Sequence, residues 1–345
     1  MVALLEPAVG PAASSDVASR PVVVQLALRF LAGLGRSLAV VVPVALVSTI
    51  VTYALGSFTN SNPAAAVLGD LATPADITRL NHQFGLDQSL PVQYWNWITA
   101  ALHGDLGVSW FTTIPVADSI KQTLPVDLSL TGLALLIALL LGGSAGIGAA
   151  LRPGSAFDRT VTALCAVAST VPAFVIGIGL IVVFAVLLPV LPSGGYAPLS
   201  EDPVQWLRFL ILPALALSLD LTADIARQLR NSLVGTLREN FVTGAEVRGL
   251  SRRRVLFRHA LRNAAGPTLT VLGYRVPQLI GGAVITETLF NLPGMGKLTL
   301  DAAAQQDIPV IQGTLLVAIT LVLLANVLVN TALVRLRPQA RRRPA

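Results

Sequence analysis

Charged residues are scarce in this chain of 345 residues: they make up 12% of it, against about 25% in an average soluble domain. Hydrophobic residues make up 54%, the mean hydropathy is +0.71, and uncharged runs longer than about 18 residues recur along the chain. These runs are continuously apolar and do not alternate, which favours helices over the strands of a membrane barrel. The sequence therefore predicts an all-α integral membrane protein.

Cysteine and histidine are scarce as well. The single cysteine, Cys165, lies in an apolar run and allows no disulfide within the chain. His82, His103 and His259 are far apart and lack the spacing of metal ligands. No nucleophile motif accompanies them, so Ser/His/Asp catalysis has no support. We therefore expect no metal site, no bound cofactor and no catalytic residue in this chain.

Acidic residues are outnumbered by basic ones, 18 to 24, which gives a net charge of +6 and a pI of about 10.2. A basic chain can bind nucleic acid, but these basic residues cluster at the ends of apolar runs, as the positive-inside rule describes. Of the 24, 19 fall in the termini and in loops predicted to be inner, and four in outer loops. We expect cytoplasmic termini and no nucleic-acid partner.

Six apolar runs predict six transmembrane helices, which place both termini on one side of the membrane. The predicted spans cover about 38–55, 128–151, 161–191, 206–227, 268–289 and 310–334. Gly142 and Gly146 have GxxxG spacing, which permits close approach of another helix, and Pro172 predicts a kink in the third span.

The chain divides by composition into four predicted units. These are a disordered cytoplasmic extension at 1–19, the first span with a long external loop at 20–127, a permease core at 128–337 with an inner region at 231–266, and a basic tail at 338–345. Within the external loop, the segments that begin at Pro74 and Pro91 each predict a short helix.

The inner region contains a strongly basic stretch at 241–267, FVTGAEVRGLSRRRVLFRHALRNAAGP, with six arginines and one acid. It resembles the coupling motif E-A-A-x3-G of permease subunits of ATP-binding-cassette (ABC) importers. Thr243, Gly244 and Ala245 occupy the place of EAA, and Gly249 that of the final glycine, with departures at the first two positions. The letters GLS at 249–251 and HALRNA at 259–264 are typical of the dipeptide/oligopeptide/nickel branch.

Other segments extend the resemblance over nearly the whole chain. GLD at 85–87, PVQY at 91–94 and GDLG at 104–107 are similar to the first outer loop of that branch. GGAVITETLF at 281–290, followed by PGMG at 293–296, is similar to its fifth span and the adjoining loop. The long first outer loop resembles that of the B-type subunit of the permease pair.

The resemblance implies a type I ABC importer permease fold in the bacterial cytoplasmic (inner) membrane. It also implies a second homologous permease, two ATP-binding subunits, an external substrate-binding protein and import of peptides. The residues implied to contact the ATPase are Thr243, Gly244, Ala245, Glu246, Gly249 and Leu250. A charge-only interpretation of this loop, in which the arginines merely fix topology, is the alternative.

The chain lacks a nucleotide site of its own. The string GMGKL at 294–298 is the nearest approach to a P-loop, but Asn291 stands where the first glycine is needed and Leu298 where Ser or Thr is needed. The string also falls in a predicted outer loop. We therefore expect ATP on partner subunits and no enzymatic activity in this chain.

Three ionisable residues fall within predicted spans: Asp220, Asp224 and Arg275. A charge at the membrane centre costs about 2.5–3.5 kcal/mol on insertion scales, so such groups face a partner or a cavity. Asp224 and Arg227 have the spacing of an ion pair, and Arg275 is a candidate partner of Asp220. A structural ion pair and a role in the substrate pathway both remain open.

Near the outer side, Glu287 and Asp301 are candidates for contact with the binding protein. Two alternatives to peptide import remain. The same machinery could carry nickel or haem, although the spans lack a cluster of metal-binding side chains. An ion-coupled secondary transporter would use the intramembrane charges and need no ATPase. A structural or signalling protein would leave the basic inner motif unexplained.

Overall fold

The computed structural model describes residues 22–57 and 62–336, and this part of the chain is helical, with one isolated bridge between Val108 and Pro115. The helices are α1 (Val22–Ser57), α2 (Pro63–Leu68), α3 (Pro74–Phe84), α4 (Leu90–Leu102), α5 (Val116–Leu151), α6 (Ala156–Ala168), α7 (Ala173–Ile181), η1 (Val182–Leu187), α8 (Pro203–Leu237), α9 (Asn240–Val247), α10 (Arg252–Arg254), η2 (Val255–Ala260), α11 (Leu261–Leu289), α12 (Met295–Gln305) and α13 (Ile308–Leu336).

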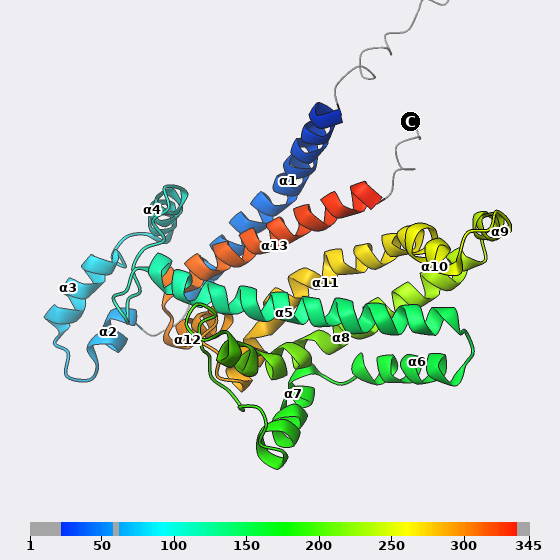
Figure 1. Cartoon of the computed structure of the whole chain (residues 1–345). Coiled ribbons are helices and arrows are strands. Elements are labelled where there is room, and N and C mark those ends of the chain that lie inside the picture. The colour runs from blue at the N-terminus through cyan, green and yellow to red at the C-terminus, as the bar shows by residue number, and fades with distance from the viewer. Residues whose placement is uncertain (1–21, 58–61, 337–345) are drawn as a thin grey trace, which may run out of the picture.

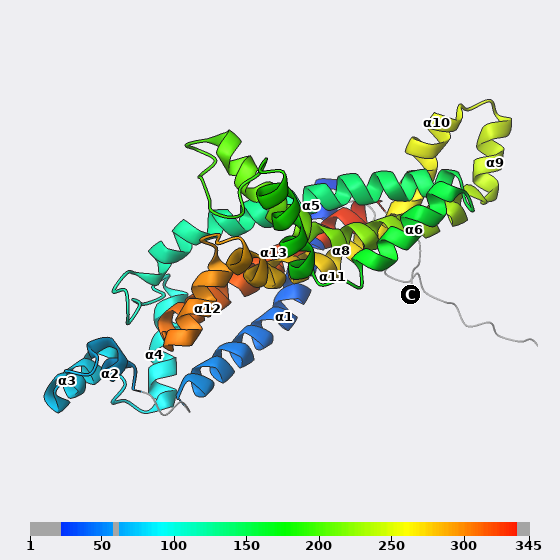
Figure 2. The same ribbon diagram turned by 90° about the horizontal axis from the view of Figure 1, so that it is seen from below.

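The molecule is elongated, with different small helices at its two ends (Figure 1). Helices α2, α3 and α4 lie at one end, and α9 and α10 lie at the other (Figures 1 and 2). The long helices α5, α8 and α11 connect the two ends, and α1 packs along α13. The predicted outer loop and the predicted inner region are therefore at opposite ends of the helical body.

The contact between α5 and α8 depends on glycine. A Cβ atom on Gly142 would lie 2.7 Å from the backbone oxygen of Thr222, and one on Gly146 would lie 2.8 Å from that of Ala226. These distances are shorter than real Cβ contacts, so the two backbones approach closely because side chains are absent there. The close approach predicted from the GxxxG spacing is confirmed, and the partner helix is α8.

The core lies where α5, α8 and α11 meet. Leu130 of α5, Leu210 and Leu221 of α8, Ala283 of α11 and the adjoining Phe290 are buried in one apolar cluster. The buried face of α8 is broad, whereas much of the apolar surface of α5 and α13 is exposed in this isolated chain. Exposed apolar surface on long helices is expected where lipid or another membrane subunit surrounds them.

Three of the described helices, α5, α8 and α13, are long and apolar enough to cross a membrane. Helices α6 and α7–η1 together make a fourth such segment, but they meet at an angle of 103°. The single kinked span predicted around Pro172 is therefore two helices. Pro172 cannot donate a hydrogen bond, and it stands at the N-cap of α7, so α6 ends at Ala168 and the chain turns. The count of six spans stays a prediction.

Several long helices, among them α1, α5, α8 and α11, continue past the apolar runs that predicted them. Helix α5 begins at Val116 and not at Leu128, so the unit boundary predicted after residue 127 falls inside a helix. Helix α8 continues to Leu237, well past the predicted end at 227. The added turns carry polar residues beside buried apolar ones such as Val116 and Ile120, and an ion pair between Lys121 and Asp118 at 2.8 Å supports the first turns of α5.

The outer segment contains both short helices that the sequence predicts, α3 and α4, together with α2, which was not predicted. Thr73 caps the start of α3 and accepts a hydrogen bond from the Asp76 N–H, while Gly85 ends the helix in the left-handed conformation. Helix α12, in the loop predicted for 290–309, was also missed. The predictions for 1–19 and 338–345 lie outside the described residues.

Candidate functional site

An ionic network joins α8 to α11 in the middle of the helical body. Arg275 of α11 donates to Asp224 at 2.6 Å through Nε and to Asp220 at 2.8 Å through Nη1. Its second terminal nitrogen also pairs with Asp224. Because Asp220 and Asp224 are four residues apart on α8, one guanidinium reaches both carboxylates. The pairing of Arg275 with Asp220, predicted from the sequence, is confirmed.

The network extends along α8 to α6. Arg227 donates to Asp224 at 2.5 Å, as the sequence predicts, and to the Ser169 hydroxyl at 3.0 Å. The side chain of Asp224 is 11% exposed and that of Arg275 is 24% exposed, while those of Asp220 and Arg227 are more than 40% exposed. Two carboxylates and two guanidinium groups balance in charge, which lowers the cost of placing them in an apolar body.

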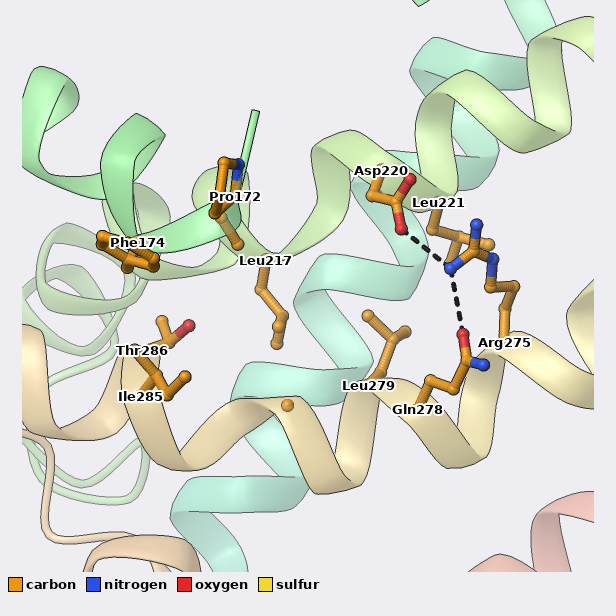
Figure 3. A pocket seen from close by; sticks show the side chains of 12 residues that line it. Pro172, Phe174, Leu217, Asp220, Leu221, Arg275, Gln278, Leu279, Ile285 and Thr286 are labelled. Atoms are coloured by element: carbon orange, nitrogen blue, oxygen red, sulfur yellow. Dashed lines mark hydrogen bonds and ion pairs between the residues drawn. The ribbon is translucent and has the colours of Figure 1, made fainter. Parts of the chain in front are cut away.

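A cavity of about 350 Å³ opens beside this network (Figure 3). Its polar end is formed by Asp220, Arg275 and Gln278, whose side-chain oxygen accepts from Arg275 at 2.9 Å (Figure 3). Phe174 and Ile285 lie at its apolar end. Helices α7, α8 and α11 thus contribute to a cavity that carries charge on one side and apolar side chains on the other.

The second candidate site is α9, at the far end of the body. Gly249 has φ +79°, and its N–H donates to the Glu246 carbonyl at 2.9 Å, while the Leu250 N–H donates to the Ala245 carbonyl at 3.2 Å. This pair of bonds is a Schellman motif, and Leu250 packs on Val242 and Ala245 as that motif requires. A Cβ on Gly249 would meet open space, so the conformation and not crowding requires glycine.

Helix α9 has one buried and one exposed face. Val242 and Ala245 are buried against Val255 of η2, whereas Thr243 and Glu246 are exposed. Val247 is 83% exposed. The basic residues that follow are also exposed: Arg248, Arg252, Arg253, Arg254 and Arg258. The residues predicted for coupling therefore split into those that shape the turn and those that present a mixed apolar and polar surface.

Comparison with known proteins assigns the chain to a family. Residues 128–342 match the family described as the inner membrane component of binding-protein-dependent transport systems, and residues 27–131 match the family of the N-terminal region of the same component. The chain belongs to this family. It is thus a permease subunit of an ABC transporter, located in the inner membrane, and ATP hydrolysis belongs to separate subunits.

Relatives of the permease cover most of its length. It is 39% identical to the probable peptide ABC transporter permease y4tP of Sinorhizobium fredii, over 81% of this chain and 90% of that protein. It is 36% identical to the di/tripeptide permease DppB of Pseudomonas aeruginosa, over 86% and 95%, and 33% identical to the dipeptide permease DppB of Escherichia coli, over 86% and 94%. A solved structure of the methionine ABC transporter MetNI, in an inward-facing conformation, aligns with 63% of this chain and 95% of that chain at 15% identity, with a TM-score of 0.49.

One candidate contact with the binding protein needs correction. Glu287 of the permease is fully buried, so its carboxyl group is not presented to a protein outside the membrane. The side chain instead accepts a hydrogen bond from the Lys297 N–H at 2.8 Å. Asp301, on α12, is exposed, and its contact with a binding protein stays a prediction.

Sequence reasoning missed several polar residues of the permease. Gln278 completes the network around Arg275, and Asp158 near the start of α6 binds Arg230 of α8 with two hydrogen bonds, at 2.7 and 3.0 Å. Asp127 on α5 is 4% exposed, and its carboxylate accepts a hydrogen bond from the Met295 N–H at 2.6 Å. The sequence signal for Asp127 was an acidic residue alone at the edge of an apolar run. Its hydrogen-bond partner, the Met295 N–H, lies on α12, far away in sequence.

Proposed function

We propose that this permease subunit carries peptides into the cytoplasm as part of an ATP-driven importer. The observation that carries this proposal is the similarity, over more than 80% of the chain, to permeases named for peptide and dipeptide transport. In this proposal the chain has six spans with cytoplasmic termini and works beside a second homologous permease. Two ATP-binding subunits and an external substrate-binding protein complete the assembly.

The proposed contact with an ATPase subunit is the exposed face of α9. Thr243, Glu246 and Val247 present that face, while Ala245, Gly249 and Leu250 hold its end in a fixed turn. A short helix with a rigid end can fill a groove on a partner and move with it as one body. The arginines around it add favourable contacts with acidic groups or lipid head groups.

A movement of α9 can be transmitted along the chain in both directions. Helix α8 ends at Leu237, shortly before α9, and α9 is followed by α10 and then by η2, which continues into α11. Val255 and Leu237 both pack on the buried face of α9. A displacement of α9 therefore acts on α8 and α11 together, and these two helices form the polar end of the cavity. This supports a mechanism in which closure of the ATPases reshapes the pathway.

The role proposed for Arg275 is to hold α8 and α11 together in the pathway wall. All three of its guanidinium nitrogens are engaged by Asp220, Asp224 and Gln278. A fully engaged guanidinium supports a structural ion pair better than a free site for a peptide carboxylate. Asp220, which is 44% exposed and lines the cavity, is the carboxylate of the network that remains open to a passing substrate.

The test is uptake of labelled dipeptides and tripeptides into vesicles that contain the permease with its partner subunits. We expect uptake to require ATP and to persist when the proton and sodium gradients are collapsed. Uptake that persists without ATPase subunits and follows an ion gradient would overturn the proposal in favour of secondary transport. Uptake of nickel or haem, with no uptake of peptide, would retain the machinery and change the cargo.

A further inference from the structure

Two carboxyl groups from different helices are buried together at the end of the body that faces α12. Asp127 of α5 is 4% exposed, and Glu287 of α11 is 0% exposed. Both carboxyl groups accept hydrogen bonds from backbone N–H groups of one helical turn, at Met295 and Lys297. Two ionised carboxylates have only acceptor oxygens, so neither could donate a hydrogen bond to the other.

The pair is seated on the first turn of α12. The Met295 N–H donates to Asp127 Oδ2 at 2.6 Å, and the Lys297 N–H donates to Glu287 Oε2 at 2.8 Å. Backbone N–H groups in the first turn of a helix have no carbonyl partner within the helix. The positive end of the dipole of α12 also favours a negative charge at this turn.

One oxygen of the pair lacks a donor. Glu287 Oε1 is buried and has no hydrogen-bond partner among the described residues. Neither carboxyl takes part in a salt bridge within residues 22–57 and 62–336. The ammonium group of Lys297 donates to Asn291 Oδ1 at 2.8 Å. A hydrogen-bond donor is therefore missing at this buried oxygen.

We propose that Asp127 and Glu287 together bind one proton, which bridges the two carboxyl groups and locks α12 onto α5 and α11. The proton supplies the missing donor, and the pair then carries a single negative charge that matches the first turn of α12. Loss of the proton would leave two negative charges in a buried site and weaken the attachment of α12.

The backbone before and within α12 is shaped to this pair. A Cβ atom on Gly294 would lie 2.3 Å from the Glu287 carboxyl carbon, and one on Gly296 would lie 3.0 Å from Glu287 Oε2. The loop can reach the carboxyl group only because side chains are absent at these positions. Other charged groups on the neighbouring segments are engaged elsewhere or exposed: Asp118 with Lys121, Asp307 with Ser109, Asp202 at the start of α8, and Asp301 at the surface.

The direct test is infrared spectroscopy of the full-length chain in lipid nanodiscs at neutral pH, which detects the carbonyl stretch of protonated carboxyl groups. We expect the band of Glu287→Gln to be weaker than that of the wild type by the intensity of one protonated carboxyl group. The band of Asp127→Asn should be weaker by the same amount. Asp301→Asn is the exposed control and should leave the band unchanged. Asp307→Asn identifies any signal from that buried carboxyl. A spectrum unchanged in both Glu287→Gln and Asp127→Asn would overturn the proposal.

A second measurement separates a proton site from a merely structural carboxyl group. We expect the thermal unfolding midpoint of the wild type to fall from neutral to alkaline pH more than that of Glu287→Gln, whose amide supplies a donor that does not titrate. Glu287→Ala should unfold at a lower temperature at every pH. Parallel pH curves for the wild type, Glu287→Gln and Asp127→Asn would contradict the proposal. If Glu287→Gln fails to fold, Asp127→Asn provides the same comparison.

Discussion

The guanidinium of Arg275 binds two carboxylates of α8 and the side-chain amide of Gln278 on its own helix. The sequence predicts part of this arrangement. The spacing of Asp220 and Asp224 places them on one face of α8, and Arg227 follows at the distance of an ion pair. Gln278 was not predictable, since an amide in an apolar helix gives no sign of its partner.

Replacement of Arg275 by Gln should destabilise the permease, because Asp220 and part of Asp224 lose their partner in an apolar body. Breaking a buried ion pair lowers the free energy of unfolding by about 3–5 kcal/mol. Because this pair is partly exposed, we expect a loss of about 3 kcal/mol. Chemical unfolding in mild detergent measures it.

The control for that prediction is Arg227→Gln, whose side chain is 43% exposed and whose loss should cost about 1 kcal/mol or less. Adding Asp220→Asn to Arg275→Gln removes the carboxylate left without a partner, since Asp224 keeps Arg227, and should restore part of the lost stability. Equal stability of Arg275→Gln and the wild type, with unchanged assembly and uptake, would show that the network serves neither structure nor substrate.

Asp307 provides a pH-dependent prediction outside the spans. Its carboxyl group is 2% exposed and accepts hydrogen bonds from Ser109 Oγ at 2.5 Å and the Trp110 N–H at 3.3 Å. Burial raises the pKa of Asp307, although the hydrogen bonds from Ser109 and Trp110 oppose the rise. The folded protein therefore holds this proton more tightly than the unfolded chain does.

The sign follows from that difference in pKa. The contribution of Asp307 to stability is full below the unfolded pKa of about 3.9 and is lost as the pH rises through the higher folded pKa. In Asp307→Asn this loss is absent, so its unfolding midpoint should fall less than that of the wild type across the same range. Thermal unfolding at a series of pH values tests this, and identical slopes would refute it.

At the scale of elements, apolar runs predicted long helices but not where those helices begin and end. Helix α5 continues outward to Val116, where Val116 and Ile120 pack in an apolar cluster with residues of α12 and α13. The third predicted span is two helices, since a proline at an N-cap can mark a turn as well as a kink. The pair of Asp127 and Glu287 was beyond sequence reasoning, because the fold alone brings α5 and α11 together.

The contact between α5 and α8 gives a prediction at this scale. In Gly142→Val, the new side chain would meet the backbone oxygen of Thr222 at 2.7 Å, and the two helices would have to separate. Overpacking of this kind costs about 1–3 kcal/mol. Gly143→Val is the matched control, since a Cβ at Gly143 has nothing within 4 Å. Lower thermal stability of Gly142→Val alone would support the account, and equal stability of the two variants would not.

At the scale of the whole molecule, the candidate sites lie at different levels of one elongated body. Helix α9 is at one end of the body and α12 lies toward the other end (Figures 1 and 2). Arg275 is midway along α11, and the pair of Asp127 and Glu287 binds the start of α12. Helix α11 carries both Arg275 and Glu287, and it follows η2, which packs on α9. Helix α11 thus connects the proposed ATPase contact to the cavity and to the pair of Asp127 and Glu287 that binds α12.

The central claim, that α9 couples the permease to ATPase subunits, depends on the turn at Gly249. Valine at Gly249 would have to adopt φ +79°, a conformation that β-branched residues strongly avoid, although its side chain would meet open space. Gly235→Val is the matched control, because Gly235 lies within α8 with no positive φ and its Cβ position is also open.

The decisive measurement compares these two variants in vesicles, with ATPase subunits co-expressed and both ATPase retention and ATP-dependent peptide uptake recorded. We expect Gly249→Val to lose at least tenfold in uptake and to retain little ATPase, while Gly235→Val keeps at least half of each. Full ATPase retention and full uptake in Gly249→Val, at wild-type levels of membrane insertion, would contradict the claim that this turn sets the contact.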